Sequence, residues 1–348
     1  MDIALQASPW NRRDLFEAAG FSVTEGPCQT EDELIDLLRH ADGAHVGPVP
    51  LTSRRVLEAC DRLKVVSRMG VGVDSIDLEA ATELGILACN VPGVNTAEVA
   101  DHAMALLLNQ TRRVHDSVTT VRNGDWGERD TVAPILETIR NIAGHTVGII
   151  GYGNIGRAFA QRVRGFGPAQ ILAYDPYVAQ LTADNQGVRL VSLDELLTES
   201  DFVSIHCTAT AETRHLIDAR ALSLMKPTSV LVNTARGPVV DGAALADALE
   251  SGQIEAAALD VTEVEPIDPD DRLVGLPNCF ITPHAAGYSP TFLHHCPIRQ
   301  AENVIRVLTG EPPHGLANPE VIKTVAVQRA NGGGRWDGVP DFSTALRL

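Results

Sequence analysis

Short apolar runs alternate with amphipathic helical segments over the first ninety or so residues. The predicted strands cover 3–5, 63–66 and 86–91, and the predicted helices cover 14–19, 34–40 and 77–84. Thr30 and Glu33 form a capping-box pattern at the start of the second of these helices. Strands that alternate with helices predict an α/β domain with a mostly parallel sheet.

A long helical pattern from Thr96 to about Arg122, followed by a polar loop over 123–128, separates this region from a second alternation. The candidate strands of the second region begin at Val147, Ile171, Phe202, Val230, Ala257 and Phe280. Six strands separated by helical patterns are what a complete dinucleotide-binding sheet requires. A further helix is predicted over 290–309, and the residues from Asn331 onward are predicted to form a flexible tail.

The stretch VGIIGYGNIGRAFAQRV, residues 147–163, contains the glycine triplet Gly151, Gly153 and Gly156. In a chain with 29 glycines, a glycine triplet by itself is weak evidence for a dinucleotide-binding turn. This triplet, however, lies between a predicted apolar strand and a predicted amphipathic helix. Gly151 would make the tight turn, Gly153 would let the backbone approach a pyrophosphate, and Gly156 would let helix and strand pack closely. Asp175, after the next apolar run, would bind the ribose hydroxyls. The alternative is a glycine-bearing turn with an incidental acid.

Composition narrows the possible functions. A length of 348 residues fits two domains, and 44% hydrophobic with 21% charged residues is typical of a globular protein. The net charge of −17 argues against a general nucleic-acid surface. The longest apolar runs are far too short to cross a membrane, and the N-terminal residues lack a signal-peptide pattern. Six scattered cysteines without metal-site spacing indicate no metal centre and a cytoplasmic location.

Three residues at predicted strand ends could carry chemistry. Arg236 can grip a carboxylate with its planar fork, His284 is placed for proton transfer, and Glu265 could orient that histidine. Each has a plainer alternative. Arg236 could form a surface salt bridge, Glu265 could be a loop acid, and His284 could be a hydrogen-bonded core histidine.

Together with the glycine triplet, several ordered motifs resemble those of the D-isomer-specific 2-hydroxyacid dehydrogenases. The matching stretches are SRMGVGVDSIDL (67–78), VSIHCTATAETRHLI (203–217), LVNTARGPVVD (231–241), AALDVTEVEP (257–266), ITPHAAGYS (281–289) and VLTGEPPHGLANPEV (307–321). The resemblance covers nearly the whole chain. It implies two doubly wound α/β domains joined by long helices, a flavodoxin-like substrate domain over 1–96 plus 289–348 and a Rossmann NAD-binding domain over 97–288.

The resemblance also implies roles for individual residues. The catalytic residues would be Arg236, Glu265 and His284, and the substrate would meet Arg68, Arg236 and the backbone N–H groups of Val71 and Gly72. The NAD-binding residues would be Gly151, Gly153, Asn154, Ile155, Gly156, Asp175, Cys207, Thr234 and Asp260, the last holding the nicotinamide carboxamide. Hydride transfer would interconvert a 2-keto acid and a D-2-hydroxy acid while His284 gives or takes the proton. A homodimer is implied as well.

Arg68 and Tyr288-Ser289 are similar to the branch that contains the carboxyl-terminal binding proteins, but Gly287 stands where that branch usually has tryptophan. Loss of the indole, together with Arg68, predicts a substrate with a bulky or second anionic group. The same branch supplies an alternative, an NADH-responsive scaffold with little turnover. A cofactor-bound sensor is a further alternative, and the identity of the 2-hydroxy acid is left open.

Overall fold

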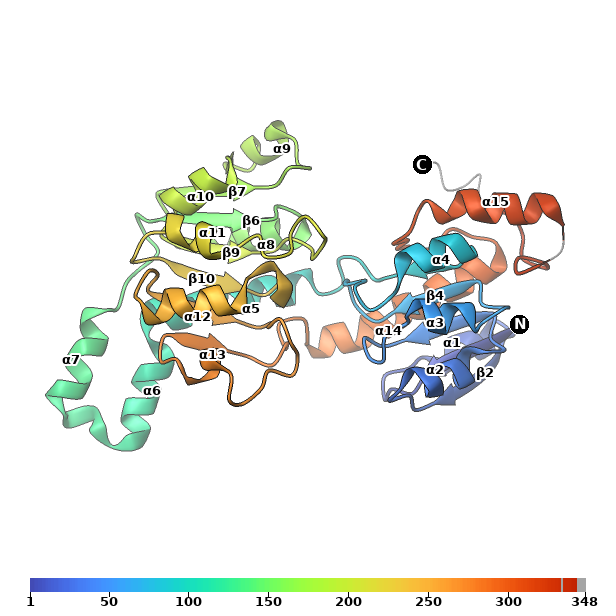
Figure 1. Cartoon of the computed structure of the whole chain (residues 1–348), viewed down its shortest axis with the longest axis horizontal. Helices are drawn as coiled ribbons and strands as arrows, with labels where there is room; N and C mark the ends of the chain where they lie inside the picture. The colour runs from blue at the N-terminus through green and yellow to red at the C-terminus, as the bar shows by residue number, and fades with distance from the viewer. Residues whose placement is uncertain (333, 343–348) are drawn as a thin grey trace. The chain divides into compact units, whose positions relative to one another are not determined.

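The computed structural model describes residues 1–332 and 334–342. The chain divides into two compact units, unit 1 with Met1–Asn95 and Ser289–Leu348, and unit 2 with Thr96–Tyr288. Each unit contains one parallel sheet (Figure 1), which confirms the predicted α/β class.

Unit 1 is built on a five-stranded sheet in the order β2-β1-β3-β4-β5, with every pairing parallel. Its strands are β1 (Asp2–Gln6), β2 (Ser22–Gly26), β3 (Gly43–Val46), β4 (Val65–Arg68) and β5 (Leu87–Cys89). This is the strand order of flavodoxin-like folds. The sequence pattern missed β2 and β3. β2 is an edge strand with mostly exposed polar side chains, and β3 is only four residues long, so neither shows a long apolar run.

Helices cover both faces of this sheet. They are α1 (Arg13–Ala18), α2 (Glu31–Leu38), α3 (Arg54–Glu58), α4 (Leu78–Leu84), α14 (Pro290–Thr309) and α15 (Val321–Asn331). The predicted capping box is present, since Thr30 accepts from the Glu33 amide while the Glu33 carboxylate accepts from the Thr30 amide. One apolar core lies under α2, α3 and α4, and a second lies under α1, α14 and α15.

The prediction of a flexible tail is wrong for residues 334–342. Trp336, Val339 and Phe342 are buried in the core of unit 1. The Trp336 indole N–H donates to the carbonyl oxygen of Gly85 at 2.9 Å, and Arg335 donates to the carbonyl oxygen of Cys60 at 2.8 Å. The glycine-rich start of this segment conceals the apolar residues that follow it. Residues 333 and 343–348, which the prediction also covered, lie outside the described residues.

Unit 2 contains a seven-stranded parallel sheet in the order β12-β11-β10-β9-β6-β7-β8. Its strands are β6 (Thr146–Ile150), β7 (Gln170–Tyr174), β8 (Arg189–Leu190), β9 (Phe202–Ile205), β10 (Val230–Asn233), β11 (Ala256–Leu259) and β12 (Cys279–Ile281). All six predicted strands are present, and the two-residue edge strand β8 was not predicted. The direction of strand progression reverses between β6 and β9. In such sheets a ligand binds at the carboxyl ends of the strands beside that reversal.

Some of the helices of unit 2 form two layers on its sheet, and others form a separate segment. The helices of unit 2 are α5 (Thr96–Arg112), α6 (Val114–Asn123), η1 (Asp125–Gly127), α7 (Arg129–Glu137), α8 (Asn154–Arg164), α9 (Gln180–Asp184), α10 (Leu193–Glu199), α11 (Ala219–Leu224), η2 (Gly237–Val239), α12 (Gly242–Glu250) and α13 (Arg272–Gly275). α5 and α8 bury their apolar sides in one core, and α10, α11 and α12 bury theirs in the other.

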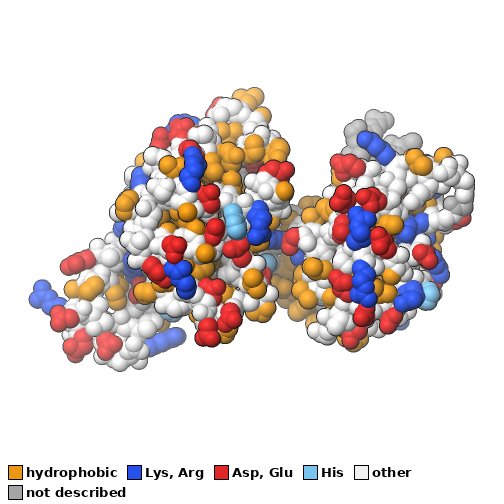
Figure 2. Space-filling view, viewed as in Figure 1, with side chains coloured by type: hydrophobic (Ala, Val, Ile, Leu, Met, Phe, Trp, Pro, Cys, Tyr) orange, Lys and Arg blue, Asp and Glu red, His pale blue; other side chains and the backbone are white. Residues whose placement is uncertain are grey.

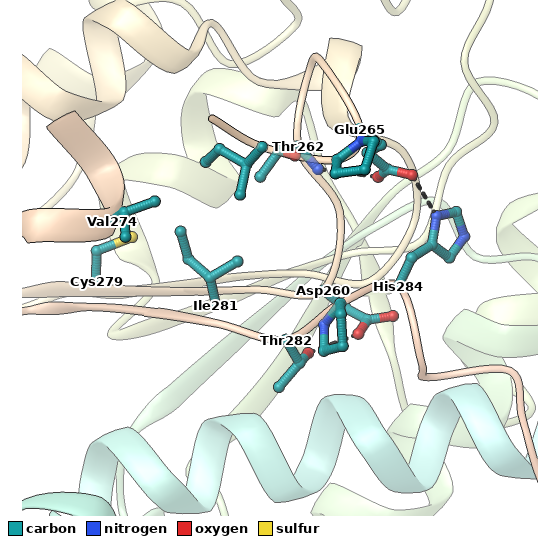
Figure 3. A pocket seen from close by; sticks show the side chains of 11 residues that line it. Asp260, Thr262, Glu265, Val274, Cys279, Ile281, Thr282 and His284 are labelled. Atoms are coloured by element: carbon teal, nitrogen blue, oxygen red, sulfur yellow. Dashed lines mark hydrogen bonds and ion pairs between the residues drawn. The ribbon is translucent and has the colours of Figure 1, made fainter. Parts of the chain in front are cut away.

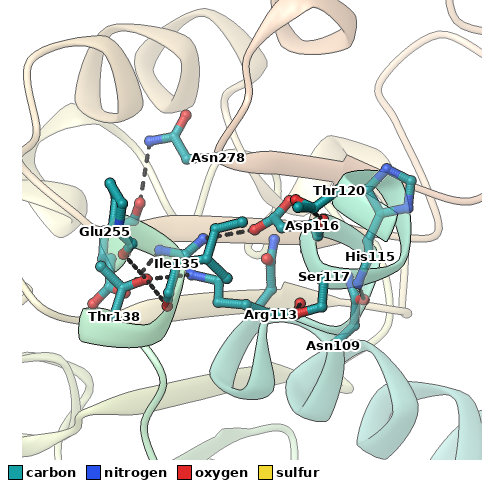
Figure 4. A network of polar contacts seen from close by, with 12 residues as sticks. Asn109, Arg113, His115, Asp116, Ser117, Thr120, Ile135, Thr138, Glu255 and Asn278 are labelled. Atoms are coloured by element: carbon teal, nitrogen blue, oxygen red, sulfur yellow. Dashed lines mark hydrogen bonds and ion pairs between the residues drawn. The ribbon is translucent and has the colours of Figure 1, made fainter. Parts of the chain in front are cut away.

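The helix expected from Thr96 to Arg122 is interrupted at Arg113, which has φ 51°, and the loop expected next contains η1. We call α6, η1 and α7 the helical arm (Figure 1). The arm is fixed to the sheet by Glu255, whose carboxylate lies 3.3 Å from Arg113 Nη2 and 2.8 Å from Arg140 Nη2 (Figure 4). Its large exposed apolar side chains are Val114, Val118, Val121, Trp126 and Leu136.

Charged side chains of both signs are interspersed on the face in Figure 2, without a broad basic patch there. Within residues 1–332 and 334–342, no helix is long and apolar enough to cross a membrane. Over the same residues, no group of three or more His, Cys, Asp or Glu side chains could hold a metal ion. All six cysteines are free thiols.

Candidate active site

The turn between β6 and α8 has the geometry of a phosphate cradle. Gly151 has φ +88°, and a Cβ there would lie 2.5 Å from the backbone nitrogen of Cys207. A Cβ at Gly156 would overlap the carbonyl oxygen of Gly151, so helix and turn are in closest contact there. A Cβ at Gly153 would instead enter open space. Gly153 is also the N-cap of α8 and gives its N–H groups no capping side chain. A pyrophosphate fits this space.

Asn154 and Ile155 form the first turn of α8, and Asp175 follows β7 at the same edge of the sheet. The Asp175 carboxylate accepts from the backbone N–H of Tyr152 at 2.8 Å and of Tyr177 at 2.9 Å. These two bonds fix the carboxylate beside the cradle, and each oxygen keeps a lone pair for a hydroxyl group.

Two further predicted cofactor residues lie at neighbouring strand ends. Cys207 follows β9, and burial raises the pKa of its thiol to about 11, so the side chain is neutral near pH 7. Thr234 follows β10, and its buried Oγ1 has no hydrogen-bond partner among the described residues. A buried hydroxyl without a partner is costly unless a ligand or water completes it. The residues present therefore fit a bound dinucleotide.

Asp260 organises the loop that carries His284. Its side chain is 1% exposed and accepts from the Thr282 hydroxyl at 2.6 Å and from the N–H groups of Ala285 at 2.9 Å and Ala286 at 2.8 Å. Burial by itself would raise the pKa of Asp260. The His102 imidazole, whose Nε2 lies 3.5 Å from Asp260 Oδ1, and hydrogen bonds from Thr282 and the two backbone amides outweigh this effect and hold that pKa below its ordinary value. Asp260 is therefore ionised at neutral pH, and protein donors already occupy both of its oxygens.

His284 and Glu265 form a close pair. His284 Nδ1 lies 2.6 Å from Glu265 Oε2 (Figure 3). The His284 backbone has φ 52°, an unusual left-handed conformation for a residue with a side chain, and its N–H donates to the carbonyl oxygen of Asp260 at 2.8 Å. Glu265 Oε1 accepts from the Thr262 N–H at 3.1 Å. With Nδ1 engaged, Nε2 is the ring nitrogen left for a substrate.

A cavity of about 610 Å³ lies beside this pair. Glu265 and His284 line one side of it, and Ile267, Val274 and Ile281 give it an apolar side (Figure 3). The side chains of His284 and Glu265 are 47% and 38% exposed, so the pair is also accessible to solvent.

Arg236 lies on the loop after β10. The buried Asn233 side chain shapes this loop, because it donates to the carbonyl oxygen of Arg236 at 2.9 Å and accepts from the Ala235 N–H at 3.0 Å. A Cβ at Gly237 would overlap the backbone of Thr262, so the Arg236 loop touches the loop of Glu265. Unit 2 thus gathers the three predicted catalytic residues on loops after the adjacent strands β10, β11 and β12.

Arg68, Val71 and Gly72 lie in unit 1, at and just after the end of β4. Arg68 is 9% exposed, and its Nε donates to the Ser75 hydroxyl at 3.1 Å. The Asn90 amide donates to the carbonyl oxygen of Val71 at 2.6 Å. These contacts order the loop internally. The binding of substrate by Arg68, Val71 and Gly72 stays a prediction.

Comparisons with known proteins agree with this geometry. The model of the D-isomer specific 2-hydroxyacid dehydrogenase NAD-binding domain matches residues 104–286. A glyoxylate reductase of Korarchaeum cryptofilum is 44% identical over 77% of this chain and 80% of its own length. A D-3-phosphoglycerate dehydrogenase of Mycobacterium tuberculosis is 40% identical over 82% of this chain but only 52% of its own, so this chain spans about half that relative. The holo form of D-mandelate dehydrogenase from Rhodotorula graminis superposes with a TM-score of 0.83 at 30% identity, covering 91% of this chain and 97% of that one.

The parallel sheets, the glycine cradle and the His–Glu pair define a dinucleotide-dependent oxidoreductase. The chain belongs to the D-isomer specific 2-hydroxyacid dehydrogenase family and carries its NAD-binding domain.

The sequence analysis did not identify the residues that hold the site in place, namely His102, Asn233 and Thr282. The last two stand inside the quoted motifs, whereas His102 stands in an ordinary helical pattern with nothing to single it out.

Proposed function

We propose that this chain interconverts a 2-keto acid and a D-2-hydroxy acid, with Arg236, Glu265 and His284 as the catalytic residues. The observation that carries the proposal is the 2.6 Å contact between His284 Nδ1 and Glu265 Oε2, on loops at the same sheet edge as the glycine cradle. A paired imidazole with its second nitrogen exposed is what general acid–base catalysis needs.

In the reducing direction, protonated His284 gives the proton on Nε2 to the keto oxygen on C2 of the substrate, which becomes an alkoxide as the hydride adds to C2. Glu265 stabilises the imidazolium before that transfer and fixes the orientation of the ring. When bound, the nicotinamide ring supplies the hydride for reduction or accepts it for oxidation. In the oxidising direction His284 takes the hydroxyl proton.

Arg236 binds the substrate carboxylate and polarises the keto oxygen. A guanidinium is suited to this because it presents two parallel donors and stays charged at any working pH. The bonds made by Asn233 support the role, since they fix the backbone on both sides of the arginine.

For the cofactor, we propose that the first turn of α8, with Asn154 and Ile155, receives the pyrophosphate, and that Asp175 binds the adenosine ribose. Cys207, Thr234 and Asp260 would line the remainder of the groove. Asp260 Oδ2, which accepts from the Ala286 N–H, would use its second lone pair to accept from the carboxamide.

The proposed substrate carries a second anionic group beyond its carboxylate. The N–H groups of Val71 and Gly72 would bind the carboxylate, and Arg68 from the same loop would face the second anion. The ordering bonds made by Ser75 and Asn90 support a preformed loop. Preformed donors lose little entropy when an anion binds.

We also propose a homodimer formed mainly through the NAD-binding units, in a cytoplasmic setting. The exposed apolar residues of the helical arm support the homodimer, because apolar side chains gathered on one element commonly mark an interface. The six free thiols support the cytoplasmic location, because a reducing compartment keeps cysteines unpaired. Light scattering at micromolar concentration that gave the mass of one chain would refute the dimer.

The test of the proposed function is NADH oxidation, followed by absorbance, with glyoxylate, pyruvate, hydroxypyruvate and phosphohydroxypyruvate. Turnover should be strongest with a doubly anionic acid, and His284→Ala should lower kcat by roughly 10²–10⁴ with little change in NADH affinity. NADH binding without turnover on any keto acid would favour the scaffold. Normal turnover in His284→Ala would refute the mechanism.

A further inference from the structure

His102 supplies a further imidazole near the catalytic loops. It lies on α5, its side chain is 25% exposed, and its Nε2 is 3.0 Å from Thr282 Oγ1 and 3.5 Å from Asp260 Oδ1. Asp260 begins the loop that carries Glu265, and Thr282 begins the loop that carries His284. One helix side chain therefore contacts the first residue of both loops.

The direction of the hydrogen bonds follows from the chemistry of the three groups. Ionised Asp260 can only accept, so the hydroxyl proton of Thr282 points toward Asp260 Oδ1, 2.6 Å away. Thr282 Oγ1 must then accept from His102. The Nε2 atom of His102 accordingly carries a proton, and the bonds run from His102 through Thr282 to Asp260.

Asp260 in turn fixes the backbone around His284. Its carboxylate accepts from the backbone of Ala285 and Ala286, and its carbonyl oxygen accepts from the His284 N–H at 2.8 Å. The His284 backbone needs such support because its left-handed conformation is costly for a residue with a side chain. A shift of Thr282 or Asp260 would move the imidazole relative to Glu265.

We propose that His102 is a positioning residue for the dehydrogenase reaction, which it serves by donating from Nε2 to Thr282 and so fixing the two loops that present Glu265 and His284. The inference rests on the proposed function, and it concerns a residue outside the predicted catalytic and cofactor-binding residues.

The hydrogen-bond path from His102 through Thr282 to Asp260 can be tested with four proteins: the wild type, His102→Phe, Thr282→Val and the double variant. Phenylalanine keeps the ring and valine keeps the shape of threonine, but neither can form the bond. His102→Phe should lower kcat roughly ten- to hundredfold with a smaller change in substrate KM, because misplacing a catalytic group by about 1 Å has that effect. Since His102 acts through Thr282, the double variant should be no slower than Thr282→Val. Effects that multiply would overturn the proposal.

Two further variants separate hydrogen bonding from packing. His102→Gln places an amide N–H2 near the position of Nε2 and should restore most of the kcat, whereas equal losses in the Phe and Gln variants would refute the donor role. His115→Phe is the matched control. His115 lies on α6 with its ring 5.2 Å from that of Phe280 on β12, so it contacts the same strand without reaching Thr282. Its kcat should match the wild type.

Hydrogen exchange gives a readout that does not depend on turnover. The backbone amides of residues 280–288 should exchange faster in His102→Phe and at the wild-type rate in His115→Phe. Faster exchange in a protein without turnover on any keto acid would show that His102 fixes the loops but would refute the proposed function. Unchanged exchange in an active enzyme would refute the positioning role alone.

Discussion

The glycine cradle makes opposite predictions for two neighbouring positions. A methyl group at Gly153 would enter open space, whereas a methyl group at Gly156 would overlap the carbonyl oxygen of Gly151 and lie 3.2 Å from Ile149 Cγ2. Gly153→Ala should therefore disturb only a ligand that occupies that space. Gly156→Ala should disturb the protein itself.

The magnitudes follow from the local geometry. Relieving the overlap at Gly156 requires α8 to move from the turn by roughly 1 Å, and overpacking of this kind typically costs about 1–3 kcal/mol. The better helix propensity of alanine returns about 1 kcal/mol, so the free energy of unfolding should fall by roughly 0–2 kcal/mol. At Gly153 the change at the N-cap costs only about 0.5 kcal/mol. Its methyl group would nevertheless occupy the proposed pyrophosphate position, so NADH affinity should fall at least tenfold, or about 1.4 kcal/mol.

Fluorescence titration with NADH and urea unfolding of the same preparations measure the two effects. The control is Gly127→Ala in the helical arm, where a Cβ also meets open space and φ is not positive, and neither quantity should change. Wild-type NADH affinity in Gly153→Ala would mean that the pyrophosphate does not lie over this turn. A higher free energy of unfolding in Gly156→Ala than in the wild type would mean that the contact between helix and turn is looser than the structure has it.

Three further substitutions test other parts of the molecule. Asp175→Ala should narrow the preference for NADH over NADPH by weakening NADH binding, since the carboxylate would repel a 2′-phosphate, and similar kcat/KM values for both cofactors in the wild type would refute this. Arg236→Lys should lower kcat/KM for every keto acid because an ammonium cannot bind a carboxylate with two parallel donors, so unchanged kinetics would refute the assignment. Burial raises the pKa of Asp42, but hydrogen bonds from Lys64 and the Asp2 amide outweigh burial and hold that pKa below its ordinary value. The contribution of Asp42 to stability is therefore present above about pH 4 and is lost as the pH falls through the lower folded-state pKa. Thermal unfolding between neutral and acid pH should show a weaker loss in Asp42→Asn than in the wild type.

The extent to which the sequence predicts the fold depends on burial. Strands such as β6 and β10 are buried along their whole length, so they appear as continuous apolar runs between turn residues. β2 has no such run, because an edge strand with one face in water can be polar at most positions. The contact between Trp336 and Gly85 could not be predicted either, because two residues so far apart in the sequence leave no local pattern.

The residues of the candidate site also differ in how well the sequence predicts them. Glycines and strand-end residues are constrained by the backbone and by a ligand common to many enzymes, so Gly151, Arg236 and His284 stand in patterns that can be read directly. Residues that hold such groups in place can be supplied by any element that passes nearby. His102 is visible only after the sheet order brings α5 under the loops of β11 and β12.

Gly287 and Arg68 carry the most specific prediction about the substrate. Gly287 is half-buried three residues after His284, and Arg68 is almost fully buried on the loop that holds Val71 and Gly72. The two relatives differ in the compounds for which they are named, since glyoxylate has a single carboxylate and 3-phosphoglycerate has a phosphate as well. If Arg68 faces the second anion, Arg68→Met should raise the KM for phosphohydroxypyruvate much more than the KM for glyoxylate. A charge-assisted contact of about 1.5–3 kcal/mol corresponds to roughly a ten- to hundredfold difference.

Gly287→Trp tests the same proposed substrate preference by adding bulk. An indole is a large apolar surface, so it should exclude a second anionic group while still accepting small or apolar keto acids. The ratio of kcat/KM for phosphohydroxypyruvate to that for pyruvate should therefore fall in both variants. In Arg68→Met it should fall because a cation is lost, and in Gly287→Trp because space is lost. The two mechanisms separate at high salt, where screening should reduce the preference of the wild type but leave the steric exclusion in Gly287→Trp unchanged. Full activity of Gly287→Trp on the doubly anionic substrate would place the pocket elsewhere.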